Sequence, residues 1–135
     1  MRISDLLAIS VVACAAVMTA MGVASAQERR WAALLPNNEV SSSVVWGATE
    51  AQARERAATA CRNVSRSCSS KASATADLGD VFALMCCTNP RLGCAAAVEA
   101  SRSKAVASVQ EIFGDAGFSG CTLRAVYSAR TGAKQ

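Results

Sequence analysis

The residues of this chain best suited to chemistry are its cysteines, and their number favours a structural role. The chain has seven cysteines and no histidine. The six that follow the N-terminal apolar segment are Cys61, Cys68, Cys86, Cys87, Cys94 and Cys121. An even number of cysteines in a small domain outside the cytoplasm is typical of a disulfide framework. Six cysteines allow 15 pairings, so their spacing leaves the connectivity open.

The adjacent residues Cys86 and Cys87 are the redox candidates. A disulfide between neighbouring residues would be strained and easily reduced. In a strand, however, neighbouring side chains point to opposite faces, which predicts a different partner for each thiol. The chain has no C-x-x-C motif, and the six residues between Cys61 and Cys68 do not supply the paired short spacings of an all-cysteine zinc site. We expect no metal ion and no other cofactor.

Other catalytic groups are scarce. Without histidine, the chain lacks catalytic triads, imidazole bases and most catalytic metal sites. Asp77 and Asp80 lie three apart in a glycine turn, where capping of the turn is a commoner role than paired-acid glycoside chemistry. No phosphate-binding loop with its lysine is present. We therefore expect a protein that is not an enzyme.

The charge pattern also excludes one class of partner. The formal net charge is +4, and no run of five like charges occurs. The main cluster alternates in sign and comprises Glu50, Arg54, Glu55, Arg56, Arg62 and Arg66. Alternating charges are typical of a solvated helix face with ion pairs rather than of a nucleic-acid or lipid surface. We expect no nucleic-acid partner.

Residues 1–26 have the pattern of a signal peptide. The segment from Leu6 to Ala26 carries no charge, and Ala24-Ser25-Ala26 forms a small-x-small site that predicts cleavage between Ala26 and Gln27. The mature chain would then be periplasmic or secreted, and would contact a membrane only transiently, through the signal segment. Two alternatives stay open: an uncleaved membrane anchor, because about 20 apolar residues can span a bilayer, and a lipoprotein anchored at Cys14, because Val11-Val12-Ala13-Cys14 resembles a bacterial lipobox.

The remaining chain divides into two parts. Residues 27–43 show no periodicity and are expected to form a flexible N-terminal segment. Residues 44–135 are expected to form a single disulfide-stabilised domain. Its strands are predicted at 44–48, 67–74, 81–87, 94–98 and 121–128. In the last strand, alternation places four side chains on one face: Cys121, Leu123, Ala125 and Tyr127.

Two helices are predicted between these strands. Thr49 and Gln52 fit a capping box, which begins a helix that ends near 62–63. Its narrow stripe of small residues comprises Ala53, Ala57, Ala60 and Cys61. The second helix begins near Ser101 or Ser103 and ends at Gly114 or Gly117. Its stripe comprises Ala105, Val109, Ile112 and Phe113.

The order of these elements predicts the fold class. A strand, a helix and a cysteine that begins the next strand occur at 44–74 and again at 94–128, which indicates an internal duplication. We predict an α+β fold with two β-α-β-like halves, a mostly antiparallel sheet and both helices on one face. Aromatic residues are only 4% of the chain, so the core is built from small side chains and is thin.

Several of these residues resemble a known family. They are Trp46-Gly47-Ala48, the alanine-rich helix closing in Ala60-Cys61, the following Cys68, and the segment Gly93-Cys94-Ala95-Ala96-Ala97-Val98. Together they resemble the exported bacterial family called domain of unknown function 4189, over residues 44–128. The resemblance implies a bacterial envelope or secreted location and a bridge between Cys61 and Cys68, and it brings no assigned activity.

The sequence thus favours an exported, non-catalytic domain that binds a protein or a cell-envelope component. The alternative is a thiol or disulfide redox protein that uses Cys86 and Cys87.

Overall fold

The structure is a computed structural model that describes residues 26–38 and 42–135. The signal segment up to residue 25, and with it the alternative at Cys14, lies outside the described residues. The elements follow in the order 3-10 helix Ala26–Arg29, β1 Trp31–Leu34, β2 Val45–Gly47, α1 Glu50–Val64, β3 Ser73–Thr75, β4 Val81–Asn89, β5 Gly93–Glu99, α2 Arg102–Asp115 and β6 Ser119–Ser128.

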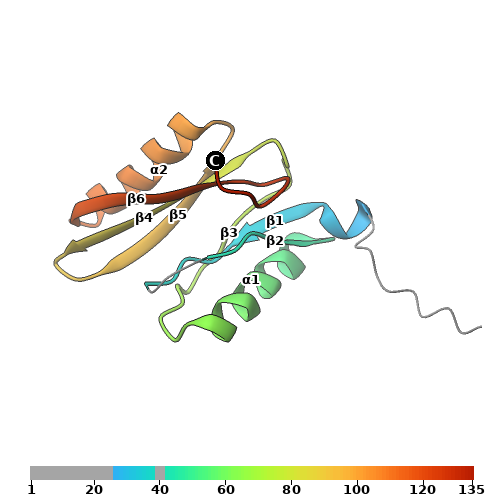
Figure 1. The fold of residues 1–135 in the computed structure, drawn as a ribbon, viewed down its shortest axis with the longest axis horizontal. Coiled ribbons are helices and arrows are strands. Elements are labelled where there is room, and N and C mark those ends of the chain that lie inside the picture. Colours follow the sequence, from blue (N-terminus) through green and yellow to red (C-terminus); the bar gives the residue numbers. More distant parts are fainter. Residues whose placement is uncertain (1–25, 39–41) are drawn as a thin grey trace, which may run out of the picture.

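The strands form two antiparallel sheets of three strands each, with the orders β2-β1-β3 and β5-β4-β6. The α+β class, the antiparallel pairing and the two helices are therefore confirmed. The arrangement of the strands and helices differs from the prediction, which was a single sheet with both helices on one face. Figure 1 shows four layers, in which the two sheets lie between α1 and α2.

The layers follow from strands that are apolar on both faces. In β1, Ala33 contacts α1, whereas Ala32 and Leu34 face the other sheet. In β4, alternate residues face α2 and the first sheet in the same way, and Phe82 is fully buried between the sheets. A strand buried on both faces needs a cover on each side, which a one-sided sheet cannot supply.

The expectation that residues 27–43 form a flexible segment outside the domain is wrong for much of its length. Residues 31–34 are the central strand of the first sheet, and Ala32, Ala33 and Leu34 have no exposed surface. Asn37 also forms an isolated β-bridge with Cys68. Residues 32–37 are all buried, so this part of the segment belongs to the core of the domain, whereas residues 28–30 are exposed.

The predicted faces of the last strand are also wrong in part. The register between β4 and β6 shifts at Leu84 and Met85, so that Leu84 pairs with Ala125 and Met85 with Leu123. This bulge moves the strand by one residue relative to its neighbour. As a result Leu123 packs against the core under α2, whereas Ala125 and Tyr127 pack between the sheets.

The two halves of the chain repeat one another in structure. Each half has two strands, a helix and a third strand, and the first strand is central in both sheets. The N-caps are Thr49 and Ser101, whose side chains accept hydrogen bonds from Gln52 N at 3.2 Å and from Lys104 N at 3.3 Å. The fourth, eighth and twelfth residues after each cap are the buried ones, Ala53, Ala57 and Cys61 in α1 and Ala105, Val109 and Phe113 in α2.

Candidate binding groove

The six cysteines form three bridges. They join Cys61 to Cys68, Cys86 to Cys94, and Cys87 to Cys121. The first bridge is the pair that the family resemblance implied. The other two connect the central strand β4 to both neighbours, since Cys86 lies opposite Cys94 on β5 and Cys87 lies opposite Cys121 on β6.

The adjacent cysteines therefore have different partners, as strand alternation predicted. Cys86 is 7% exposed and Cys87 has no exposed surface. Their bridges lie on opposite faces of the second sheet, because Cys87 belongs to the core under α2 and Cys94 packs against the core between the sheets. This placement gives both cysteines a structural role in the sheet.

A groove of about 950 Å³ lies beside α1 and is lined by several charged residues. One wall is a helix face on which Glu50, Arg54, Ala58 and Arg62 follow one another at intervals of four residues, a spacing that aligns side chains along a helix. The opposite wall is the segment 65–72, which carries Arg66 and Lys71. We call this feature the basic groove.

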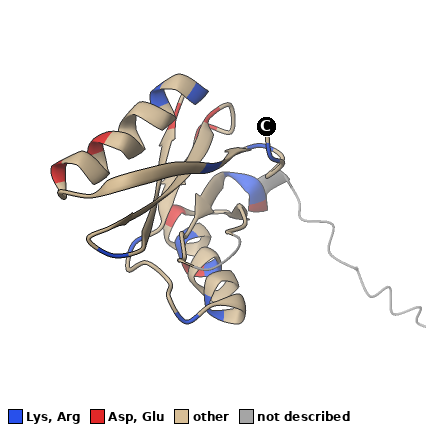
Figure 2. Ribbon diagram, turned by 60° about the vertical axis from the view of Figure 1, so that its left-hand side comes forward, with Lys and Arg blue, Asp and Glu red and all other residues tan. Residues whose placement is uncertain are grey.

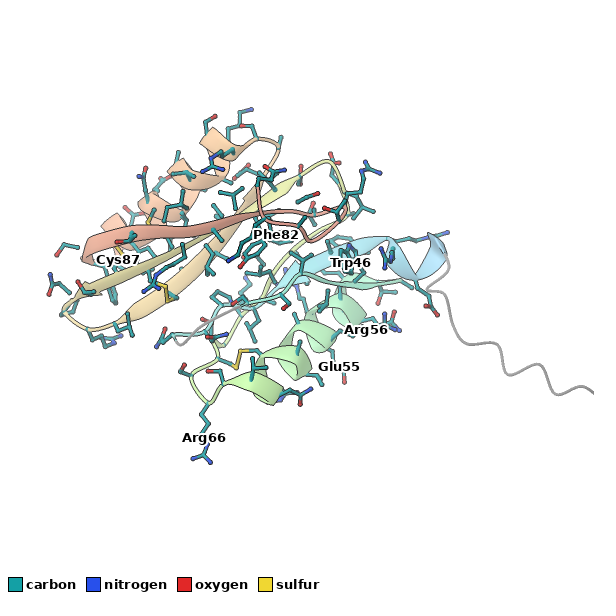
Figure 3. All side chains as sticks on the ribbon, viewed as in Figure 1. Trp46, Glu55, Arg56, Arg66, Phe82 and Cys87 are labelled. Atoms are coloured by element: carbon teal, nitrogen blue, oxygen red, sulfur yellow. A yellow bond between two sulfur atoms is a disulfide. The ribbon has the colours of Figure 1, made fainter. Side chains whose placement is uncertain are left out.

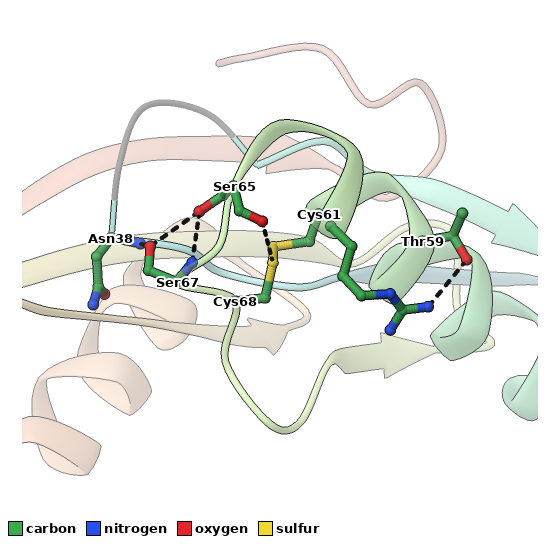
Figure 4. The surroundings of a disulfide bond; sticks show 7 residues. Asn38, Thr59, Cys61, Ser65, Ser67 and Cys68 are labelled. Atoms are coloured by element: carbon green, nitrogen blue, oxygen red, sulfur yellow. Dashed lines mark hydrogen bonds between the residues drawn. A yellow bond between two sulfur atoms is a disulfide. The ribbon is translucent and has the colours of Figure 1, made fainter.

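The segment 65–72 is irregular, and three kinds of contact fix it in place. The disulfide joins its Cys68 to Cys61 in the last turns of α1, as Figure 4 shows. Ser67 N donates to Ser65 Oγ at 3.0 Å, and Asn38 N donates to Ser67 Oγ at 3.1 Å. Ser69 N donates to the Pro36 carbonyl at 2.9 Å. Residues 36–38, expected to be flexible, thus support one wall of the groove.

Arg54 connects the two walls. Its Nη2 lies 2.7 Å from Glu50 Oε1, and its Nη1 donates to the Ala72 carbonyl. Among the residues that the structure describes, this is the single ion pair, so the alternating charges form fewer ion pairs than the sequence indicated. Arg56 lies outside the groove and donates to the Trp46 carbonyl at 2.8 Å.

The other cations of the groove have no carboxylate beside them in the described structure. Arg62 has one long contact, with Thr59 Oγ1 at 3.5 Å, and Arg66 extends from the loop after α1 away from the body of the protein in Figure 3. Lys71 is exposed. Four cationic side chains thus line the groove against one carboxylate, and Figure 2 shows blue segments on α1 and on the loop that follows it.

The acidic pair of the turn at 77–80 has the capping geometry that the sequence favoured. Asp77 Oδ1 accepts from Gly79 N at 2.9 Å, and Asp80 Oδ2 accepts from the Thr75 hydroxyl at 2.7 Å. Both carboxylates are therefore engaged in local turn contacts. Within the described residues, no group of three or more His, Cys, Asp or Glu side chains is placed to hold a metal ion.

The disulfides indicate the compartment in which the protein functions. Three bridges in a small domain are typical of oxidising compartments outside the cytoplasm, which is where we place this domain. No helix in the described part of the chain is both long and apolar enough to cross a membrane.

Comparison with protein-family models, with curated proteins and with solved structures finds no match to this chain. The candidate site therefore rests on the geometry of the basic groove. The charge pattern of the sequence marks Arg54, Arg62 and Arg66 but predicts a solvated face for them. Lys71 and the serines of the opposite wall are not predicted from the sequence, because only the fold brings that segment beside α1.

Proposed function

We propose that this chain is an exported, non-catalytic domain that binds an anionic protein or cell-envelope component in the basic groove. The observation that carries the proposal is the excess of cations there. Arg62, Arg66 and Lys71 line one concave surface without a carboxylate partner in the described structure.

Concavity is what distinguishes these cations from scattered surface charges. Protein walls of low dielectric focus the field of like charges in a cleft and raise the local concentration of counter-ions. Ser69 and Ser70 add hydroxyl groups to the same surface, and hydroxyls can donate to oxyanions. The volume of about 950 Å³ lies in the range of about 300–1,000 Å³ typical of ligand sites.

For the location, we propose that residues 1–26 are removed between Ala26 and Gln27 and that the mature chain is periplasmic or secreted. Membership of the family domain of unknown function 4189 stays a prediction that agrees with this location. Intact mass spectrometry of the exported protein tests the location. A chain starting at Gln27 should gain two hydrogens for each of three bridges on reduction. A lipidated chain starting at Cys14, or an uncleaved chain, would contradict the proposed processing.

Binding is tested with fluorescein-labelled polyglutamate, followed by fluorescence anisotropy at low ionic strength. We expect saturable binding that weakens as salt is added, because salt screens exposed charges. The double variant Arg62→Glu/Arg66→Glu should bind about 30-fold more weakly, since each reversal replaces an attraction of ~0.5 kcal/mol by a repulsion of similar size, a change of ~2 kcal/mol for the two.

The matched control is Arg102→Glu/Arg124→Glu, which makes the same change in net charge at two exposed positions outside the groove. The two double variants are compared at about 0.1 M salt, where the Debye length is about 10 Å. There we expect the control to bind polyglutamate within about twofold of the wild-type protein, because its charges lie outside the groove. Equal losses in the two double variants would show that net charge alone governs binding and would overturn the groove as the site.

A further inference from the structure

The two halves of the fold meet along two seams, and one of them is filled by a tryptophan. Trp46 of β2 packs against the core between the sheets, and its Nε1 donates to the Ala129 carbonyl at 2.8 Å. The Arg29 guanidinium lies 4.7 Å from the centre of its ring. A Cβ at Gly132 would lie 3.0 Å from Trp46 Cη2. Trp46 is thus packed closely against the C-terminal residues at this seam.

The residue at the corresponding place in the second half is Val98. Trp46 is the third residue before the N-cap of α1, and Val98 is the third residue before the N-cap of α2. Both pack against the same core between the sheets, and both are only partly buried. A valine thus stands at the second seam, between β3 and β5, where a tryptophan stands at the first.

This second seam is open. The two strands contact each other through Ser73, whose Oγ donates to the Ala96 carbonyl at 3.0 Å. Beside them lies a groove of about 470 Å³, whose apolar lining includes Ala74, Val98 and Ile112. Ile112 was predicted to face the core, but it is 48% exposed. We call this surface the apolar groove.

The apolar groove and the basic groove form one continuous surface. Arg54, Lys71 and Ala72 line both of them, as do the serines at 69 and 70. A single extended ligand can therefore contact the cations at one end and the apolar side chains at the other.

We infer that the occupant is an acidic polypeptide segment that also carries a large apolar side chain. Its carboxylates lie against Arg62, Arg66 and Lys71, and its apolar side chain, aromatic by analogy with Trp46, packs against Val98 and Ile112. The inference rests on the proposed function and deepens it. An acidic polysaccharide matches the basic groove alone, because its hydroxyls and carboxylates would desolvate at the apolar groove without hydrogen-bond partners. The apolar end therefore favours a polypeptide.

The test compares two probes that differ in one side chain. One is a fluorescein-labelled, glutamate-rich peptide with a tryptophan near one end, and the other has alanine in place of that tryptophan. We expect the wild-type protein to bind the tryptophan peptide about tenfold more tightly, because burial of a large apolar side chain contributes at least this factor.

Three variants show where the tryptophan of the peptide binds. Ile112→Ser should abolish it and leave polyglutamate binding unchanged, whereas Leu92→Ser, a matched change of a side chain 45% exposed at the tip of the β4–β5 hairpin, should preserve it. Val98→Trp should also abolish the preference, because the new side chain would occupy the seam. Ile112 lies outside the buried core, so its replacement reports on the ligand rather than on folding.

The outcomes separate this inference from the proposed function. The inferred occupant is overturned if the wild-type protein binds the two peptides equally, or if the preference for tryptophan survives Ile112→Ser. In either case, binding of polyglutamate would still support an anionic partner. Tighter binding of polygalacturonate than of the tryptophan peptide overturns the assignment to a polypeptide. Absence of binding to every anionic probe overturns both.

Discussion

Removal of the disulfides one at a time should rank them by the length of chain that each one closes. The bridges Cys61–Cys68, Cys86–Cys94 and Cys87–Cys121 have sequence separations of 7, 8 and 34 residues. The chain-entropy model gives stabilisations of about 2.5, 2.6 and 3.8 kcal/mol, respectively. We therefore expect Cys87→Ala/Cys121→Ala to lower the free energy of unfolding by about 1.3 kcal/mol more than Cys61→Ala/Cys68→Ala.

The two double variants can be compared directly because both lose a similar amount of buried packing. Cys61 and Cys87 are 4% and 0% exposed, so each pair loses one buried sulfur. Urea unfolding followed by the fluorescence of Trp31 and Trp46 measures the difference. The ranking by loop entropy would be refuted if Cys61→Ala/Cys68→Ala lowered the free energy of unfolding as much as Cys87→Ala/Cys121→Ala does, or more.

The same two variants should have the opposite ranking in binding. Cys61→Ala/Cys68→Ala frees one attachment of the segment 65–72, which carries Arg66 and Lys71. We expect this variant, although folded, to bind polyglutamate about fivefold more weakly, because the loop must be ordered when the ligand binds. Cys87→Ala/Cys121→Ala should bind as the wild-type protein does, and an equal loss in both would contradict this role for the first bridge.

Three further changes test local features of the fold. A Cβ at Gly47 would lie 2.5 Å from the Ala53 backbone nitrogen, so Gly47→Ala should destabilise the protein by about 2–3 kcal/mol in urea unfolding; an unchanged midpoint would contradict the close approach of β2 to α1. Thr49→Ala removes the cap of α1 and should cost about 1 kcal/mol, whereas Thr49→Ser should cost little. Burial raises the pKa of Tyr127 above its ordinary value of 10.0. The free energy of unfolding should therefore fall as pH rises above about 10, because the unfolded chain releases the phenol proton first. An ultraviolet titration of the folded protein that gives the ordinary pKa would exclude this contribution.

The sequence predicted those parts of the fold that have a regular apolar pattern or a helix N-cap. The apolar run at 81–87 became the central strand β4, and Thr49 and Ser101 became the N-caps of α1 and α2. Strand alternation also predicted different partners for Cys86 and Cys87. The strand Trp31–Leu34 was missed because burial on both faces removes the alternation of polar and apolar residues by which a strand is recognised.

The groove could be predicted only in part, for a different physical reason. Glu50 and Arg54 are four residues apart and Arg62 follows eight residues later, a spacing that is visible in the sequence and places all three on one face of a helix. The position of the opposite wall depends on contacts between segments far apart in the chain, such as that of Asn38 with Ser67. Helical periodicity also assigned Ile112 to the core, but the sheet beneath α2 covers a narrower stripe and leaves this side chain exposed.

The difference between the two halves explains why the basic groove lies in the first one. In each half, the twelfth residue after the N-cap holds the segment that follows the helix in the chain. In the second half, Phe113 packs on Phe118 with ring centres 5.4 Å apart, and β6 begins directly afterwards at Ser119. In the first half, Cys61 bonds Cys68 instead, and β3 begins only at Ser73. The disulfide thus holds an irregular segment that carries Arg66 and Lys71, so the shape of the groove depends on an oxidising compartment.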